Sequence, residues 1–233
     1  RKLADERGVD ITTVTPASPA GVIKQSDIPQ AGSREEKARD QIAGVVNTSM
    51  QIPQFSINKE IEIGAPLSSD AAERFVQLAR AWVGTMRAHT KFTQQYVSGS
   101  FVPANIRVAA LVRSPLGYVS PAIDAAGIDG EDWSQKAKAL IAGAKENRIA
   151  VENLGGASTS ITDLSEFGIR SANTLLFPPQ SSGITIGSVV SDSHKVALDV
   201  TLVVDHRLAD PGDAAEALVT FEKLLREVAN GNS

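Results

Sequence analysis

His206 is the residue of this sequence that is best placed for proton-transfer chemistry. It comes just after the apolar run Val196–Val204, and Asp205 and Asp210 lie close to it in the chain. Loops at the ends of strands often display catalytic side chains, and an imidazole gives or takes a proton near neutral pH. One histidine beside acidic residues is equally compatible with a structural role. The spacing therefore makes His206 a candidate general base and leaves both interpretations open.

The other two histidines are weaker candidates for catalysis or metal binding. His89 and His194 lie among polar and basic residues, which is typical of solvated surface positions, and neither has the spacing of a metal-ligand pair. The chain contains no cysteine, which excludes disulfides, thiolate nucleophiles and cysteine-bound metals. We therefore expect no metal centre, and the lack of cysteine fits a reducing, cytoplasmic compartment.

A run of hydroxyl side chains is the second candidate feature. Ser158, Thr159, Ser160 and Thr162 follow the pair Gly155–Gly156. In most proteins such a run is merely a polar strand face, but in an acyl-transfer site one hydroxyl can donate to a developing oxyanion. The two glycines lack the pattern of a nucleotide-binding loop, so they predict a turn that enters a strand.

Composition narrows the classes of function. The 233 residues are 42% hydrophobic and 21% charged, values of a globular chain with a sizeable core. A net charge of −4 and 5% aromatic residues argue against a nucleic-acid partner, which favours basic faces and stacking platforms. No apolar run is long enough to span a membrane.

The chain is expected to contain a small unit and a large domain. Residues 1–28 hold too few apolar side chains for a sizeable core and predict a tiny helical module, residues 29–33 predict a linker, and residues 34–233 predict the main domain. Apolar spacing predicts a mixed sheet covered by helices. The expected helices cover residues 38–46, 70–86, 133–144 and 213–228, and the expected strands cover residues 55–63, 106–112, 118–123, 184–188 and 196–204. Asp70 and Asp213 are the expected N-caps, each with a glutamate three residues later.

Four segments in order resemble one family, the acyltransferase component of 2-oxo acid dehydrogenase complexes. Residues 205–210 (DHRLAD) resemble its signature Asp-His-Arg-x-x-Asp-Gly, and residues 156–168 resemble its Gly-Gly-Thr-Phe-Thr-Ile-Ser-Asn-Leu-Gly stretch. Pro178–Gln180 matches its Pro-Pro-Gln turn, and Ile106–Ile123 resembles its Ala-Val-x-x-x-x-Gly-Leu-x-x-Pro-Val-Ile segment. Each match alone is weak, but the ordered set covers most of residues 34–229.

The resemblance implies an α/β (α+β) fold like that of chloramphenicol acetyltransferase, a two-layer mixed sheet with helices. It also implies a homotrimer whose active sites lie between subunits, with acyl-CoA, most simply acetyl-CoA, as a substrate. By this resemblance His206 removes the proton from the acceptor, Thr162 of a neighbouring subunit stabilises the oxyanion, and Asp210 orients the loop or assists proton transfer. Residues 1–10 and 21–27 resemble the family's peripheral subunit-binding module, which docks partner enzymes.

Departures from the family pattern separate three hypotheses. Pro211 stands in place of the signature glycine, Ser165 replaces another glycine, and these residues contain no lipoyl domain or apolar C-terminal tail. These features favour a free-standing O-acetyltransferase of the kind that acetylates a hydroxyl in tetronate polyketide biosynthesis. The alternative is the catalytic core of a dihydrolipoamide acyltransferase, whose acceptor is a thiol. The third hypothesis, an inactive assembly scaffold, is motivated by Pro211 and opposed by His206, Asp210 and Thr162.

Overall fold

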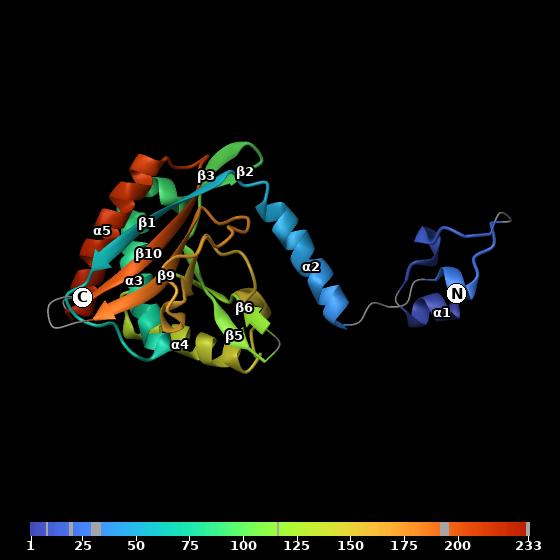
Figure 1. Ribbon diagram of the computed structural model, residues 1–233, viewed down its shortest axis with the longest axis horizontal. Coiled ribbons are helices and arrows are strands. Elements are labelled where there is room, and N and C mark those ends of the chain that lie inside the picture. The colour runs from blue at the N-terminus through green and yellow to red at the C-terminus, as the bar shows by residue number, and fades with distance from the viewer. Residues whose placement is uncertain (8, 19–20, 29–33, 116, 192–195, 232–233) are drawn as a thin grey trace. The chain divides into compact units, whose positions relative to one another are not determined.

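A computed structural model of the chain describes residues 1–7, 9–18, 21–28, 34–115, 117–191 and 196–231 (Figure 1). Its internal contacts divide it into two units, Arg1–Asn47 and Thr48–Ser233. The predicted linker at residues 29–33 and His194 lie outside the described residues. The predicted domain start at residue 34 falls on the first residue of helix α2 (Arg34–Ser49) and stays a prediction.

Residues 1–28 of the first unit contain short helical segments, and the rest of that unit includes most of α2. The short segments are α1 (Lys2–Glu6) and the 3₁₀ turns η1 (Ile11–Thr13) and η2 (Gln25–Asp27). Ala4 and Ile28 are buried, and the Arg7 guanidinium donates to the Ile28 carbonyl at 2.7 Å. So few buried apolar atoms give a small core, stabilised in part by local hydrogen bonds.

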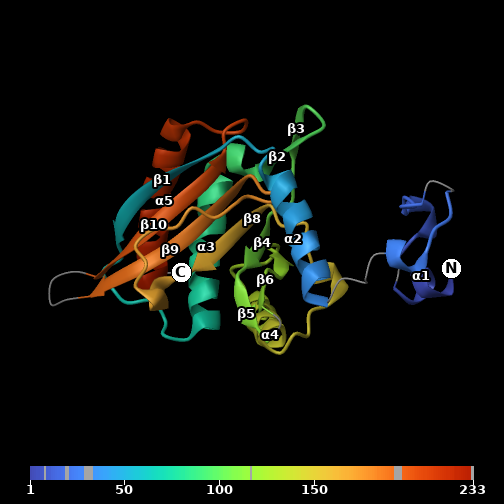
Figure 2. The same cartoon turned by 45° about the vertical axis from the view of Figure 1, so that its right-hand side comes forward.

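A mixed sheet is the centre of the second unit, as the sequence predicts (Figure 2). Among the described residues the strands are β1 (Gln54–Glu62), β2 (Gln94–Val97), β3 (Ser100–Pro103), β4 (Arg107–Ala110), β5 (Val112–Ser114), β6 (Gly117–Val119), β7 (Ala122–Asp124), β8 (Thr159–Asp163), β9 (Ser182–Ser191) and β10 (Val196–Asp205). Six of them form one sheet in the order β1-β10-β9-β8-β4-β7, while β2–β3 and β5–β6 form separate hairpins. Strand β8 is parallel to β4 and β9, and the other neighbours are antiparallel.

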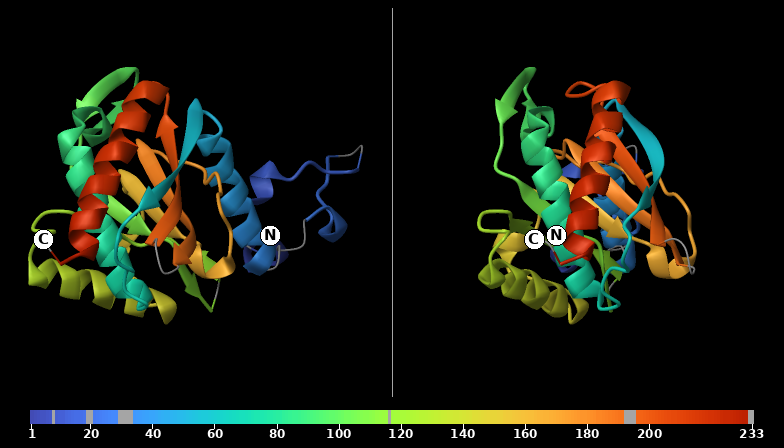
Figure 3. Two further views of the ribbon diagram at one scale, coloured as in Figure 1. Left: turned by 60° about the vertical axis from the view of Figure 1, so that its left-hand side comes forward. Right: turned by 90° about the vertical axis from the view of Figure 1, so that its left-hand side faces the viewer.

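Two long helices pack side by side against one face of this sheet (Figure 3). The helices of the second unit are α3 (Ala71–Ala88), α4 (Glu131–Lys145) and α5 (Pro211–Ala229), with 3₁₀ turns η3 (Thr90–Thr93), η4 (Val151–Asn153) and η5 (Ser165–Phe167). Helix α3 begins where the sequence predicts, because the Asp70 carboxylate accepts hydrogen bonds from the amides of Ala72 and Glu73. Among the described residues no helix is both long and apolar enough to cross a membrane.

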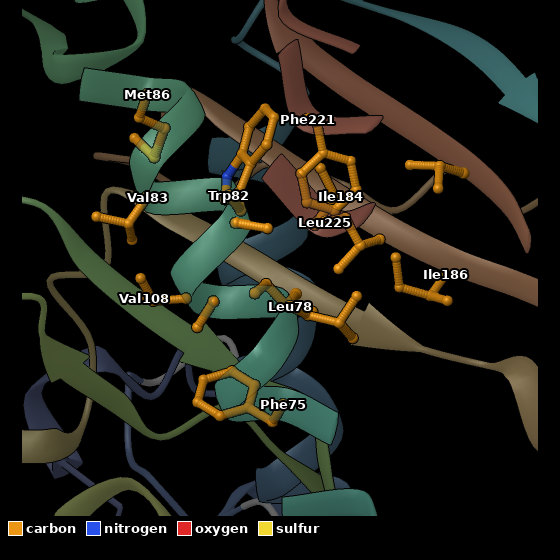
Figure 4. Close-up of a cluster of buried hydrophobic side chains, with 14 of the residues drawn as sticks. Phe75, Leu78, Trp82, Val83, Met86, Val108, Ile184, Ile186, Phe221 and Leu225 are labelled. Carbon is orange, nitrogen blue, oxygen red and sulfur yellow. The ribbon is translucent and has the colours of Figure 1, made fainter. Parts of the chain in front are cut away.

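The main core fills the space between these helices and the sheet. Trp82 of α3 meets Phe221 of α5 with ring centroids 5.7 Å apart, and Ile184 of β9 completes the contact (Figure 4). The predicted α3 stripe is buried throughout, and each fully buried Phe, Leu or Met contributes about 1.5–3 kcal/mol. The indole N–H of Trp82 donates to the Thr159 hydroxyl at 2.8 Å, so its one polar group is satisfied.

Two charged residues that interrupt apolar strands have partners far away in the sequence. Lys59 of β1 forms a salt bridge of 2.8 Å with Glu222 of α5. Asp199 lies at an irregularity of β10, between Leu198 and Val200, and forms a salt bridge of 3.0 Å with Arg170. Each misfit in the strand pattern thus corresponds to a charge that is paired rather than buried alone.

The face of the sheet opposite the helices is covered by residues 169–180, a segment without helix or strand. Leu176 from this segment is fully buried against Val203, and its amide donates to the Gln54 side chain at 3.0 Å. The covering segment runs very close to β9, since a Cβ placed on Gly187 would lie 2.2 Å from the Arg170 carbonyl oxygen. Only glycine therefore fits at position 187 without moving backbone.

Replacing Gly187 by alanine is expected to destabilise the second unit. The new methyl group would overlap a backbone oxygen, which cannot rotate away like a side chain, so the free energy of unfolding should fall by about 1–3 kcal/mol. Urea denaturation of Gly187→Ala measures the loss, with Gly44→Ala as the control because nothing lies within 4 Å of a Cβ there. Equal stability of the Gly187→Ala variant and the wild type would contradict the close approach.

Candidate active site

His206 emerges at the end of the buried strand β10, as the sequence predicts. Its amide donates to the Pro53 carbonyl at 2.7 Å, and its ring lies 4.8 Å from the ring of Phe55, centroid to centroid. The apolar residues of β10 are buried under the helices or the covering segment, whereas His206 itself is exposed. The strand thus carries the imidazole from the core to the surface, where a substrate can reach it.

Asp205 and Arg207, which flank His206, bind each other. The Asp205 carboxylate is 2% exposed and accepts hydrogen bonds from the Arg207 amide at 3.0 Å, from Nε at 2.9 Å and from Nη2 at 2.6 Å. These bonds raise the pKa of Arg207, because they favour its charged form. The Leu208 amide also donates to the Asp205 carbonyl at 2.9 Å, which closes a tight turn around His206. Asp205 therefore stabilises the turn instead of pairing with the imidazole.

Asp210 is the N-cap of helix α5, four residues after His206. Its carboxylate accepts from the Asp213 amide at 3.0 Å, and the Asp213 carboxylate accepts from the Asp210 amide at 2.9 Å. The expected N-cap at Asp213 is therefore wrong by three positions. The reason is Pro211, whose fixed φ and missing N–H suit the first position of a helix.

The Asp213 carboxylate is held by two partners whose effect depends on pH. Hydrogen bonds from the Asp210 amide and from Lys91, at 2.6 Å, lower the pKa of Asp213. A lowered folded-state pKa means that the ionised form stabilises the fold above the unfolded pKa, and that this contribution disappears as pH falls through the folded value. The contribution is thus present at neutral pH and lost in acid.

The Asp213→Ala variant is expected to lose about 1 kcal/mol of stability at pH 7, the usual contribution of one hydrogen bond, because it removes the capping-box bond from the Asp210 amide. Its difference from the wild type should shrink below about pH 4, where carboxylates become protonated. Denaturant titrations across this pH range measure the difference. Glu216→Ala, one turn later in α5, is the control, and a larger loss in that variant would contradict the cap at Asp210.

Thr162 lies on β8 with 6% of its surface exposed. Its neighbour Ile161 belongs to the core under the helices, so Thr162 faces the opposite side of the sheet, because adjacent strand residues alternate. Ser158 exchanges hydrogen bonds with the Arg107 backbone, and Thr159 binds the Trp82 indole. Among the described residues the Thr162 hydroxyl makes no hydrogen bond, so it is available to a substrate oxygen.

Within one chain His206 and Thr162 lie far apart. Thr162 pairs with Thr185 of β9, and Thr185 pairs with Thr201 of β10, five residues before His206. Two strand spacings across the sheet and five residues along it separate the two Cα positions by about 20 Å. The two side chains can therefore share a substrate only if different copies of the chain supply them.

A cavity of about 550 Å³ lies between the start of α3, the end of α4, the β5–β6 hairpin and η5. Arg74 on its wall is held by Asp163 at 2.5 Å, whereas Arg113 and Lys145 form no salt bridge with any described residue. Tyr118 and Phe167 add exposed aromatic surface. Sequence reasoning missed this cavity because five separate segments supply its walls.

The other features noted in the sequence have structural roles. His89 ends α3, and its Nε2 lies 2.8 Å from the Thr220 hydroxyl of α5, so the expected solvated surface role is corrected to a helix–helix contact. Gly155 and Gly156 both have positive φ, at 80° and 67°, and form the predicted turn before β8. Among the described residues no group of three or more His, Asp or Glu side chains is arranged to hold a metal ion.

Known proteins resemble this chain in sequence and in fold. The sequence profile of the family described as 2-oxoacid dehydrogenases acyltransferase (catalytic domain) matches residues 33–230. The dihydrolipoyllysine-residue acetyltransferase component of the pyruvate dehydrogenase complex of Rickettsia conorii is 33% identical over 130 residues, 52% of this chain and 32% of that protein. The matched region thus spans about a third of the length of this curated relative.

Two solved structures confirm the expected fold. The dihydrolipoamide acetyltransferase of Azotobacter vinelandii superposes with a TM-score of 0.70 at 15% identity, over 82% of this chain and 88% of that one. Chloramphenicol acetyltransferase gives a TM-score of 0.51 at 14% identity, over 84% and 95%. Because the family profile matches nearly all of the second unit, the chain belongs to the 2-oxoacid dehydrogenase acyltransferase (catalytic domain) family.

Proposed function

We propose that this protein transfers an acyl group, most simply acetyl, between CoA and a dihydrolipoyl thiol, with His206 as the general base. The observation that carries the proposal is the exposed imidazole at the exit of β10, four residues before Asp210. In the Azotobacter vinelandii enzyme a serine, a histidine and an asparagine four positions after that histidine have been investigated for roles in the catalytic mechanism. The equal spacing supports the assignment of His206 and Asp210.

The chemistry follows from these side chains. His206 removes the proton of the acceptor thiol, and the thiolate attacks the carbonyl carbon of the acyl thioester. The resulting oxyanion accepts a hydrogen bond from Thr162, a contribution of about 3 kcal/mol to the barrier. Collapse of the tetrahedral intermediate expels the CoA thiolate, which takes the proton back from the imidazolium. Asp210 contributes by fixing the start of α5, and hence the end of the loop that carries His206.

The acceptor proposed here is a thiol, and not the hydroxyl that the departures from the family pattern favoured. The named relatives are a dihydrolipoyllysine-residue acetyltransferase and a dihydrolipoamide acetyltransferase, and these names favour the thiol acceptor over the tetronate assignment. Pro211, the main departure from the family signature, no longer argues for a different reaction. It occupies the first position of α5, where proline is favourable, so it implies neither a different reaction nor an inactive scaffold.

A homotrimer is the assembly that this mechanism needs. The separation of about 20 Å within one chain requires that His206 and Thr162 come from neighbouring copies, and a head-to-tail ring of three supplies this contact at every interface. Residues 1–28 remain a candidate docking module for a partner enzyme, supported by their short helical segments and by the sequence resemblance of residues 1–10 and 21–27.

The cavity beside β8 is the proposed site for the nucleotide part of acyl-CoA. Two cations without salt bridges suit phosphate groups, and the aromatic faces of Tyr118 and Phe167 suit a purine ring. Arg113→Ala should therefore raise KM for acetyl-CoA roughly fivefold, since a solvent-exposed ion pair contributes about 1 kcal/mol or less, while kcat changes little. Arg148→Ala, an exposed cation outside the cavity, is the control in steady-state assays, and equal KM values in both variants would exclude the cavity.

The proposed function is tested by offering two acceptors to the purified chain with acetyl-CoA. Mass spectrometry should detect S-acetyl dihydrolipoamide, and its formation should disappear in the His206→Asn variant. A small alcohol offered under the same conditions should remain unmodified. Acetylation of the alcohol without the thiol would favour the O-acetyltransferase hypothesis, and modification of neither would overturn the proposed activity.

A further inference from the structure

The β2–β3 hairpin reaches the turn that carries His206 through one aromatic side chain. This hairpin is separate from the six-stranded sheet and extends beyond its end (Figure 2). Tyr96 of β2 pairs in register with Phe101 of β3, and their rings are 5.3 Å apart at an angle of 64°. Because register partners share a face of a hairpin, Gln95 and Val102 lie on the other face.

The Tyr96 ring supports the guanidinium of Arg207, the residue directly after His206. The central carbon of the guanidinium lies 4.2 Å from the centre of the Tyr96 ring, a cation–π distance. The N–H groups at Nε and Nη2 bind Asp205 at the same time. Since the Arg207 side chain is 30% exposed and Asp205 is 2% exposed, Tyr96 covers a charge pair at the edge of the core.

This contact completes the support around His206. On one side the Pro53 carbonyl and the Phe55 ring hold the backbone and the imidazole of His206. On the other side Asp205 binds Arg207, and the hairpin contributes the ring of Tyr96. If the ring were lost, the guanidinium would gain solvent and rotamers, and the Asp205–Arg207 pair would lose the aromatic group that covers it.

We propose that Tyr96 is a positioning residue for His206 and acts through Arg207, an inference that rests on the proposed role of His206 as general base. Tyr96 raises the fraction of molecules in which the imidazole points correctly at the acceptor thiol. It makes no contact with the reacting atoms in this assignment. The rate of the chemical step should therefore depend on the ring of Tyr96, while substrate affinity should not.

Substitutions that keep or remove the ring test this role. Tyr96→Leu should lower kcat about tenfold, within the threefold to thirtyfold range of a cation–π contact, and should leave KM unchanged. Tyr96→Phe keeps the ring face and should retain kcat within about twofold. Val102→Ala, on the other face of the hairpin, is the matched control and should behave like the wild type. The positioning role is overturned if Tyr96→Leu keeps full kcat, or if Tyr96→Phe loses as much as Tyr96→Leu.

The dependence on Arg207 is tested by combining substitutions. Arg207→Lys removes the planar group that stacks on Tyr96, so adding Tyr96→Leu to it should cause no further loss of kcat. If instead the two losses multiply, Tyr96 does not act through Arg207. Thermal denaturation of every variant separates loss of positioning from loss of fold.

A measurement without substrate separates this inference from the proposed function. The chain has only three histidines, so imidazole resonances can be assigned by NMR with the His206→Asn variant. Tyr96→Leu should shift or broaden the His206 signal and leave the His89 signal in place. An inactive wild-type protein would overturn the proposed function while the NMR result still decides the positioning role, and an unmoved His206 signal would overturn that role even in an active enzyme.

Discussion

Replacing His206 by alanine should lower the rate of acyl transfer by about 10²–10⁴-fold, the usual contribution of a general base. The thiol would then have to lose its proton to water before it attacked the thioester. The free energy of unfolding should change little, because the imidazole is exposed. The contact that the variant loses is the one with the ring of Phe55. Steady-state kinetics with acetyl-CoA and dihydrolipoamide measure the rate, and urea denaturation measures the stability.

The control for this experiment is a histidine with a structural role. His89→Gln should reduce stability, because His89 joins α3 to α5 through Thr220, while kcat remains close to the wild-type value. Opposite behaviour of the two variants would show that the loss is specific to the site. Full activity of His206→Ala would remove this imidazole from the mechanism.

Thr162→Val should lower kcat by about 10²–10³-fold, as does the removal of an oxyanion donor in other enzymes. Valine fills nearly the same volume at this buried position, so the fold should persist. Thr162→Ser keeps the hydroxyl and should retain most of the activity. A serine variant as slow as the valine variant would contradict this role, because a hydroxyl at position 162 would then not be enough to sustain the rate.

Mixed oligomers test whether two copies share each site. Co-expressing His206→Ala chains with Thr162→Val chains should restore about a quarter of the wild-type activity, because a head-to-tail ring then contains some interfaces with both intact residues. Neither variant alone should show this activity. A mixture as inactive as its components would mean that His206 and Thr162 do not act together across an interface.

Apolar periodicity predicted the helices and most of the core, because those positions are decided locally. The stripe from Phe75 through Trp82 to Met86 is buried because the helical period of 3.6 places these residues on one face. The N-cap of α5 was misplaced because Pro211 was interpreted as a departure from the family signature. Its preference for the first position of a helix is an equally local signal that points to Asp210.

The hairpin that carries Tyr96 was not predicted, although a signal for it exists. Ser98 and Gly99 both have positive φ, and a Ser-Gly pair is typical of a tight turn. The flanking strands, four residues each, are too short and too polar at Gln94 and Gln95 for alternation to stand out. The stacking of Arg207 on Tyr96 could not be predicted at all, because 111 positions of sequence separate them.

Some parts of the candidate site could be predicted from the sequence and others could not. His206 and Asp210 belong to one short motif and could be identified together, whereas the cavity formed by Arg113, Tyr118 and Lys145 depends on how distant segments pack. The role of Asp205 could also be identified only from the structure. The sequence shows only that Asp205 lies beside His206, whereas the structure shows that its carboxylate binds Arg207.

The pairing of β1 with β10 has a consequence for how the protein is made. Gln54 lies opposite Asp205, so an early strand of the sheet pairs with its last one, across 151 positions of sequence. A ribosome that adds about 5–20 residues per second leaves β1 without this neighbour for roughly 8–30 s. During translation the nascent polypeptide must keep the hydrogen-bonding groups of β1 away from other chains, and the turn bearing His206 takes shape only after β10 has been synthesised.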